Sequence, residues 1–303
     1  TQKTEEQRYK MTVAAKERLQ SADIAAKGKV VKAYGNLLQV KFQGDIRQGE
    51  IALVKLGTTS LKAEVIEIVG DEAKIQVYED TRGVRLNTPV EFERVLLEAE
   101  LGPGLLTSIF DGLQNPLEEI ATTAGHFLPR GIYLNSLDRE QRWDYTPIAK
   151  VGDILSRGEV LGTTLERRFH HDIMVPFSHF GRYTITWVAP AGSYTIEEPI
   201  AKATDEKGEA HTFCMLQRWP IKIPLIQGEK MLASKMLTTG MRIVDTQFPI
   251  MKGGTFCSPG PFGAGKTVLQ HHLSKYSAVD IVIVCACGER AGEVVEVLRE
   301  FPH

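Results

Sequence analysis

A glycine-rich stretch ending in a lysine and a threonine is the part of the sequence best suited to chemistry. Residues 260–267 read GPFGAGKT and satisfy the spacing G-x-x-x-x-G-K-[S/T] in full. Glycines permit positive φ angles, which let backbone N–H groups crowd around phosphate oxygens. The stretch therefore predicts a phosphate-binding loop, whose residues we expect to be Gly260, Pro261, Phe262, Gly263, Ala264, Gly265, Lys266, Thr267 and Val268.

The two polar side chains at the end of this loop have separate expected roles. The Lys266 ammonium should reach the β- and γ-phosphates of a nucleotide, and the Thr267 hydroxyl should ligate Mg²⁺. The residues around the loop fit this reading, because TFCS at 255–258 is typical of a short strand and TVLQHHLSKY at 267–276 of a helix. A helix starting near Gly265 would direct a partial charge of about +0.5 at the same anion.

A glutamate follows the next expected strand. The segment DIVIVCAC at 280–287 ends at Gly288-Glu289-Arg290. Ligands of open α/β sheets lie at the carboxyl ends of the strands, so Glu289 would face the γ-phosphate if the two strands are neighbours. A carboxylate there can orient the attacking water, which contributes roughly 10²–10⁴-fold to the rate. A helix-capping or solvent-facing glutamate is the alternative that the spacing leaves open.

The rest of the chain is mostly β. Five short strands are expected within residues 28–96, which favours a small barrel. Gly35-Asn36 suits a tight hairpin, and the strand around 62–69 carries apolar residues on both faces, which indicates a bulge or burial on two sides. The predicted division is a 1–27 extension, a 28–97 barrel, a 98–129 linker, an inserted 130–215 β-rich region, and a 216–303 part of a parallel α/β domain.

Several other patterns are weaker. The barrel strands lack the exposed aromatic and basic residues that stacking on nucleic-acid bases needs. VGDILSRGEVLGT at 151–163 resembles the half-barrel of biotinyl and lipoyl carrier domains, but the hairpin lysine that would carry the cofactor is missing. His170, His171 and His179 suggest a metal site, yet adjacent strand residues point to opposite faces, so a strand edge is the preferred reading. The cysteines, expected to be reduced and not metal ligands, are Cys214, Cys257, Cys285 and Cys287.

Composition narrows the class of protein. The 303 residues include 43% hydrophobic and 24% charged residues with a net charge of -2, as in an ordinary globular protein. This balance argues against a generally basic nucleic-acid binder. The apolar run IVIVCAC at 281–287 is too short to span a bilayer, and the polar N-terminus is unlike a secretion signal. Any connection to a membrane is therefore expected to run through partners.

Five separated motifs together resemble the catalytic A (alpha) subunit of V-type and archaeal A-type rotary ATPases. They are FDGLQNPL, MLQRWP, TGMRIVDTQFPIMKGG, PGPFGAGKT and CGER, and the resemblance runs from about residue 28 to 303. It implies a β-barrel, an inserted β-rich region and a partial RecA-like P-loop domain. It also implies ATP or ADP with Mg²⁺ as ligands, Lys266 and Glu289 as catalytic residues, and Arg290 as a residue that organises the site.

The resemblance further implies partners and a place in the cell. We expect a B subunit in an alternating hexamer, central-stalk and peripheral-stalk subunits, no nucleic acid, and a cytoplasmic location on the face of a membrane. Many eukaryotic A subunits carry a loop cysteine where this chain has Ala264, which disfavours redox control and favours a prokaryotic source.

A-type subunits are much longer than 303 residues, so the chain is interpreted as truncated within the nucleotide-binding domain and inactive alone. Two alternatives stay open at this point. One is another hexameric P-loop ATPase, such as a helicase or secretion ATPase, and the other is a fragment acting only as an interaction module.

Overall fold

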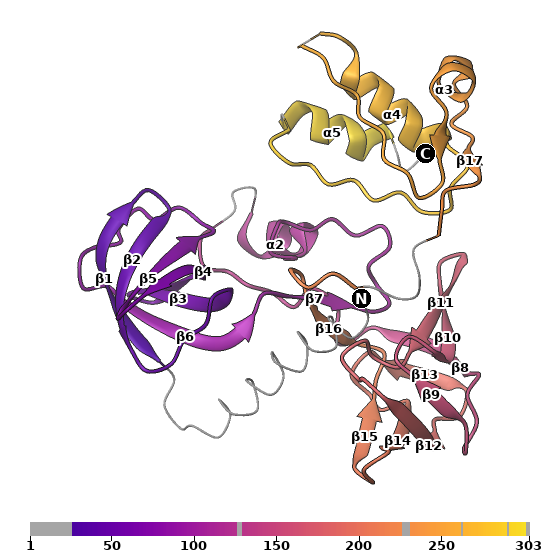
Figure 1. Cartoon of the computed structure of the whole chain (residues 1–303), viewed down its shortest axis with the longest axis horizontal. Coiled ribbons are helices and arrows are strands. Elements are labelled where there is room, and N and C mark those ends of the chain that lie inside the picture. The colour runs from indigo at the N-terminus through magenta and orange to yellow at the C-terminus, as the bar shows by residue number, and fades with distance from the viewer. Residues whose placement is uncertain (1–25, 126–128, 226–230, 262, 290, 301–303) are drawn as a thin grey trace. The chain divides into compact units, whose positions relative to one another are not determined.

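The computed structural model describes residues 26–125, 129–225, 231–261, 263–289 and 291–300. The chain divides into two compact units, Thr1–Gln227 and Gly228–His303, which are treated separately below (Figure 1). Residues 1–25 of the expected extension, and the site residues Phe262 and Arg290, lie outside the described residues.

Six antiparallel strands at the start of the first unit close into a barrel. Their order around the barrel is β1-β2-β5-β4-β3-β6 (Figure 1). Alternate residues point inward, as Leu38 and Val40 do on β2, and both are fully buried. The predicted hairpin is confirmed, since Gly35 has a φ of 60° between β1 and β2. The bounds are β1 Lys27–Tyr34, β2 Leu37–Gln43, β3 Glu50–Leu56, β4 Thr59–Val69, β5 Glu72–Val77 and β6 Pro89–Leu96.

The apolar residues on both faces of β4 are explained by a bulge, as the sequence suggested. The register between β4 and β5 shifts between Val65 and Glu67. Val65 is fully buried in the barrel, whereas Ile66 is 39% exposed. One extra residue therefore bends the strand and lets the barrel close.

Two four-stranded sheets form the β-rich region after the barrel. One has the order β11-β10-β8-β13 and the other β15-β14-β12-β9. Their shared core includes the fully buried Leu161, Ile196 and Ile200. The bounds are β8 Arg142–Pro147, β9 Ile154–Ser156, β10 Val160–Glu166, β11 Phe169–Met174, β12 Arg182–Val188, β13 Gly192–Thr195, β14 Ala201–Asp205 and β15 Ala210–Phe213.

A two-stranded ribbon closes the chain around this β-rich region. Strand β7, Glu98–Leu101, pairs with β16, Gln217–Pro220, and places Leu101 opposite Gln217. Glu100 Oε1 accepts hydrogen bonds from Arg139 Nη2 at 2.6 Å and Arg218 Nη2 at 3.0 Å. Burial favours the neutral form of Glu100, but the two guanidinium groups stabilise the carboxylate more strongly and hold its pKa below the ordinary value. Helix α2, Leu117–Ala124, lies within the expected 98–129 linker of this unit.

The second unit is small and open. It contains β17 Met236–Leu237, α3 Arg242–Gln247, β18 Ile250–Met251, α4 Lys266–Tyr276 and α5 Ala291–Glu300. The segments 255–258 and 280–287, expected as strands, are in no strand. A parallel strand needs hydrogen-bonded neighbours, and the described residues of this unit supply none for either segment. The predicted fold class of barrel, β-rich region and partial nucleotide-binding domain is nevertheless confirmed by the comparisons given below.

A close approach between strands β10 and β8 generates a test of this packing. A Cβ atom at Gly162 would lie 2.6 Å from the carbonyl oxygen of Thr146 and would overlap the ring of Tyr145. Gly162→Ala should therefore lower the free energy of unfolding by roughly 2–4 kcal/mol.

The matched control is Gly112→Ala, since a Cβ there meets nothing within 4 Å, and it should change stability by less than about 0.5 kcal/mol. The chain's three tryptophans, Trp143, Trp187 and Trp219, belong to the β-rich region or its closing ribbon, so their fluorescence in a urea titration reports on this part. Equal midpoints for the two variants would contradict the packing.

A partly buried histidine is expected to make the stability of the same region depend on pH. The His179 ring packs 5.1 Å from Phe213 and 5.6 Å from Tyr183, centroid to centroid. Burial, with a smaller contribution from the charge of His211, lowers the pKa of His179 to about 4. The unfolded chain takes up this proton near pH 6.5, so stability should fall as the pH drops from about 6.5 to 4, by at most about 3 kcal/mol.

His179→Phe should remove that part of the pH dependence, as measured by urea titrations at several pH values. The exposed His170 supplies the control variant His170→Gln, which should keep the slope of the parent chain. A His179→Phe variant with the parent's slope would show that His179 is not the group responsible.

Candidate nucleotide-binding loop

The loop before α4 has the backbone that its glycines predict. Gly263 and Gly265 have φ angles of 83° and 82°, which favour glycine. Gly265 is the N-cap of α4 in a left-handed conformation, and Leu269 N donates to its carbonyl at 2.9 Å. No side chain caps this helix, and no acidic residue lies in its first turn. The amide N–H groups at the start of α4 are thus left for an anion.

The loop also folds back on itself so that its lysine lies near its first glycine. A Cβ at Gly260 would stand 3.0 Å from Ala264 Cβ and 3.7 Å from Lys266 Cγ. The distance to Lys266 is an ordinary van der Waals contact, so it is the close approach to Ala264 that a side chain at position 260 would disturb. Lys266 and Thr267 are half-buried, while Val268 is 73% exposed. The structure thus brings Gly260, Ala264 and Lys266 close together within the loop.

Glu289 lies at the end of the extended segment 281–287, one residue after Gly288, whose φ is 72°. Its side chain is exposed. Among the residues that the structure describes, no hydrogen bond or ion pair joins Glu289 to the phosphate loop. Its catalytic role therefore stays a prediction, as does that of Arg290.

A turn that the sequence analysis did not single out positions the far end of α4. Asp245 Oδ1 accepts hydrogen bonds from Thr239 N at 2.9 Å and Thr239 Oγ1 at 2.7 Å. These bonds lower the pKa of Asp245, and Thr239 is fully buried. The neighbouring Thr238 carbonyl accepts a bond from Ala278 N at 2.8 Å, just beyond the helix. The only sequence signal was the motif TGMRIVD, which carries no chemistry by itself.

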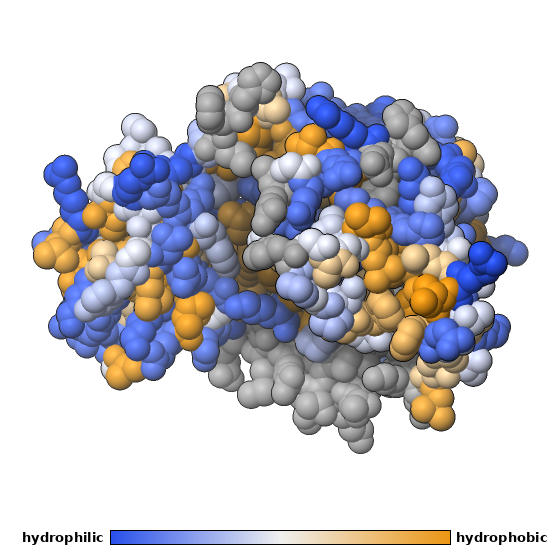
Figure 2. Space-filling view, turned by 90° about the horizontal axis from the view of Figure 1, so that it is seen from above, coloured by the Kyte–Doolittle hydropathy of each residue, from blue (hydrophilic) through white to orange (hydrophobic). Residues whose placement is uncertain are grey.

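The unit that holds the loop leaves much apolar surface uncovered. No residue of α4 is buried, and Ile283 is 84% exposed. Ile281, Val282 and Val284 are also about half exposed. Figure 2 shows apolar residues at the surface of the molecule among hydrophilic ones. Such a surface is typical of a domain whose core is completed by further protein.

The histidines considered as metal ligands take other roles. His171 Nδ1 lies 2.8 Å from Glu166 Oε2, and the buried Glu166 also accepts bonds from Gly104 N at 2.8 Å and Leu106 N at 3.0 Å. His171 therefore supports a carboxylate that fastens the linker to strand β10. His179 belongs to the aromatic cluster described above.

Comparisons with known proteins match all three parts of the chain. Residues 30–94 match the beta-barrel domain of the ATP synthase alpha/beta family, residues 134–222 the alpha/beta subunit barrel-sandwich domain, and residues 240–303 the nucleotide-binding domain. The half-barrel suggested for residues 151–163 agrees with the second of these.

Curated relatives agree with the family models. The chain is similar to the V-type ATP synthase alpha chain of Protochlamydia amoebophila, at 67% identity over 92% of this chain and 47% of the relative. The corresponding proteins of Chlamydia muridarum and Chlamydia pneumoniae are each 60% identical over 91% and 92% of this chain, and 46% and 47% of theirs. The chain thus spans about half the length of these relatives. The three family models and these identities show that the chain belongs to the ATP synthase alpha/beta family, on its V-type alpha side.

Proposed function

We propose that this chain is part of the ATP-binding catalytic subunit of a rotary V/A-type ATPase, which couples ATP hydrolysis or synthesis to the transport of protons or sodium ions. The observation that carries the proposal is the loop at 260–267, with its uncapped helix N-terminus and its half-buried lysine. The names of the curated relatives support the same activity.

The chain's own residues would divide the work on Mg·ATP. The first amides of α4 and the Lys266 ammonium would bind phosphate oxygens, and the Thr267 hydroxyl would hold Mg²⁺. Glu289 would orient the attacking water, and Arg290 would organise the site. The donor set fits the ion, because a hydroxyl together with phosphate oxygens is what Mg²⁺ accepts in such sites.

We propose the same surroundings for the subunit that the resemblance implies. These are a B subunit in an alternating hexamer, stalk subunits, and a position on the cytoplasmic face of a membrane. Among the described residues, no helix has the length and apolar character needed to cross a bilayer. The exposed apolar surface of the second unit supports the need for further protein around the loop.

Phosphate recognition can be tested on the 303-residue chain by calorimetric titration with Mg·ATP. Lys266→Ala should weaken binding by at least about tenfold, because it removes the charge at the β- and γ-phosphates. The matched control is Lys275→Ala, which removes one positive charge from the last turn of the same helix and should leave the affinity within about twofold. Equal losses in both variants would point to a nonspecific effect of charge.

Catalysis needs a different test, because hydrolysis by this family relies on an arginine from a neighbouring subunit. Such a residue contributes roughly 10³–10⁵ in rate, so the 303-residue chain alone should turn over ATP negligibly. In the longer subunit assembled with its partner, Glu289→Gln should lower the hydrolysis rate by about 10²-fold or more and preserve nucleotide binding.

Glu296→Gln is the control for this second test, since Glu296 is an exposed glutamate on α5 for which we expect no role in the reaction. Phosphate release by the assembled complex is the measurement. Full activity in Glu289→Gln would remove Glu289 from the mechanism and leave the phosphate loop unaffected.

A further inference from the structure

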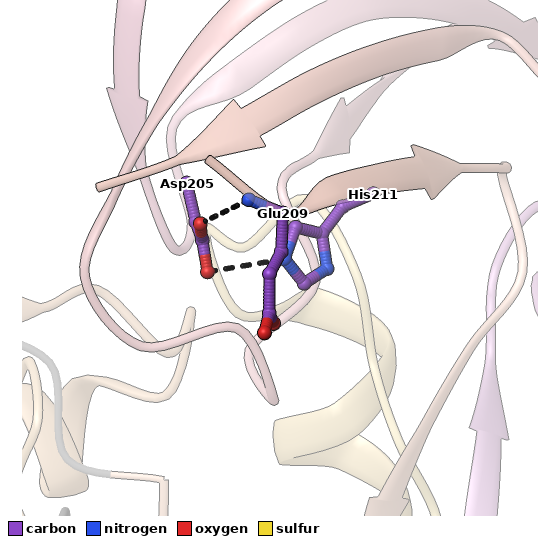
Figure 3. Close-up of side chains that lie close together, drawn as sticks. All are labelled: Asp205, Glu209 and His211. Atoms are coloured by element: carbon purple, nitrogen blue, oxygen red, sulfur yellow. Dashed lines mark hydrogen bonds and ion pairs between the residues drawn. The ribbon is translucent and has the colours of Figure 1, made fainter. Parts of the chain in front are cut away.

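Three side chains of the kinds that bind metal ions converge on one hairpin of the first unit. Asp205 ends strand β14, Glu209 lies in the turn, and His211 lies on β15 (Figure 3). One carboxylate oxygen from each acid and one imidazole nitrogen all lie within 4.8 Å of one another. None of these residues belongs to the nucleotide loop, which is in the other unit.

The hairpin backbone fixes the first of these ligands. Asp205 Oδ1 accepts bonds from Lys207 N at 2.9 Å and Glu209 N at 2.8 Å. Gly208, with a φ of 86°, permits the tight turn that makes both bonds possible. The carboxylate is therefore held in one orientation, and its second oxygen, Oδ2, is directed at His211 (Figure 3).

The imidazole is fixed independently, by aromatic packing. The His211 ring lies 5.2 Å from Tyr183 and 5.5 Å from His179 between centroids, and it meets both rings nearly at right angles. These contacts come from residues outside the hairpin. The imidazole is thus held in one orientation by Tyr183 and His179. A ligand that is already oriented needs no rearrangement when it binds an ion.

The distance between these two groups fits a shared ion better than a direct bond. His211 Nε2 lies 3.4 Å from Asp205 Oδ2, which is beyond the usual range of about 2.7–3.2 Å for a hydrogen bond. Two ligands at about 2.0–2.1 Å from a tetrahedral Zn²⁺ stand about 3.4 Å apart. The exposed side chain of Glu209 can close the remaining gap by rotation.

We propose that Asp205, Glu209 and His211 form a binding site for a divalent transition-metal ion, with Zn²⁺ as the ion that fits best. One imidazole and two carboxylates suit such an ion, whereas Mg²⁺ and Ca²⁺ prefer oxygen ligands alone. A water molecule would complete the tetrahedron. The bound ion would join the end of β14 to the start of β15 across their turn.

The test is a calorimetric titration of the 303-residue chain with Zn²⁺ alone, without nucleotide. The exposed thiols of Cys257, Cys285 and Cys287 are first alkylated with iodoacetamide, because thiolates also bind zinc. The parent chain should bind one equivalent that is lost, or weakened at least tenfold, in both Glu209→Gln and His211→Gln. His170→Gln, which removes an exposed histidine from another hairpin, should bind like the parent.

Folding of the variants is followed by tryptophan fluorescence during heating. Glu209→Gln keeps the backbone bonds of the turn and should melt like the ion-free parent, and zinc should raise the melting temperature of the parent but of neither variant. Absence of binding to the parent would overturn the proposal. Unchanged affinity in either Glu209→Gln or His211→Gln would overturn it as well, and would reduce the Asp205–His211 contact to a weak hydrogen bond.

Discussion

One partly buried carboxylate connects the parts of the first unit. Glu100 lies on the ribbon strand β7 and receives guanidinium groups from Arg139, ahead of the sheets, and from Arg218 on the returning strand. Its own backbone N–H and C=O are bonded to the side chain of Gln114 in the linker. Removing either guanidinium group is costly, because it leaves the carboxylate charge only partly compensated in a place that water reaches poorly. The paths of the linker, the inserted sheets and the return strand are all defined at this residue.

The second unit follows a different physical logic. Its glycine-rich loop leads into helix α4, whose first amide groups are capped by no side chain, and free amides at a helix start can hold phosphate. The turn at Thr239 and Asp245 secures the other end of α4. The helix between these two points has no buried residue. Among the residues that the structure describes, no strand pairs with the segment 281–284 that follows it. The described part of this unit thus contains a formed binding loop but little buried hydrophobic core.

Local sequence signals predicted local structure well. Gly35-Asn36 predicted its hairpin, and the glycine spacing at 260–265 predicted positive φ angles in the loop. The apolar residues on both faces around Val65 indicated a bulge or burial on two sides, and the structure has the bulge. These succeed because backbone conformation at a glycine or a pleated strand depends on a few adjacent residues.

Contacts between distant residues were not predictable in the same way. The β7–β16 pairing joins residues more than a hundred positions apart, and neither short strand has a pattern that names its partner. The proximity of Asp205 and His211 was not predicted, because a single histidine such as His211 gives no sequence pattern comparable to the adjacent pair His170 and His171. The strands expected at 255–258 and 280–287 are absent for a related reason, since an apolar segment forms a strand only where a neighbouring strand can pair with it.

The ribbon also sets an order of assembly. Leu101 and Gln217 face each other, so forming β7–β16 from an unfolded chain would close a loop of about 115 residues at a large entropic cost. Once the two sheets between them have condensed, the ends of that loop are already close and the cost has been met by hydrophobic burial. The two sheets should therefore fold first, and the pairing of β7 with β16 should form last. Folding of the sheets between β7 and β16 would thus spare the chain a slow search for contact between two segments more than a hundred residues apart.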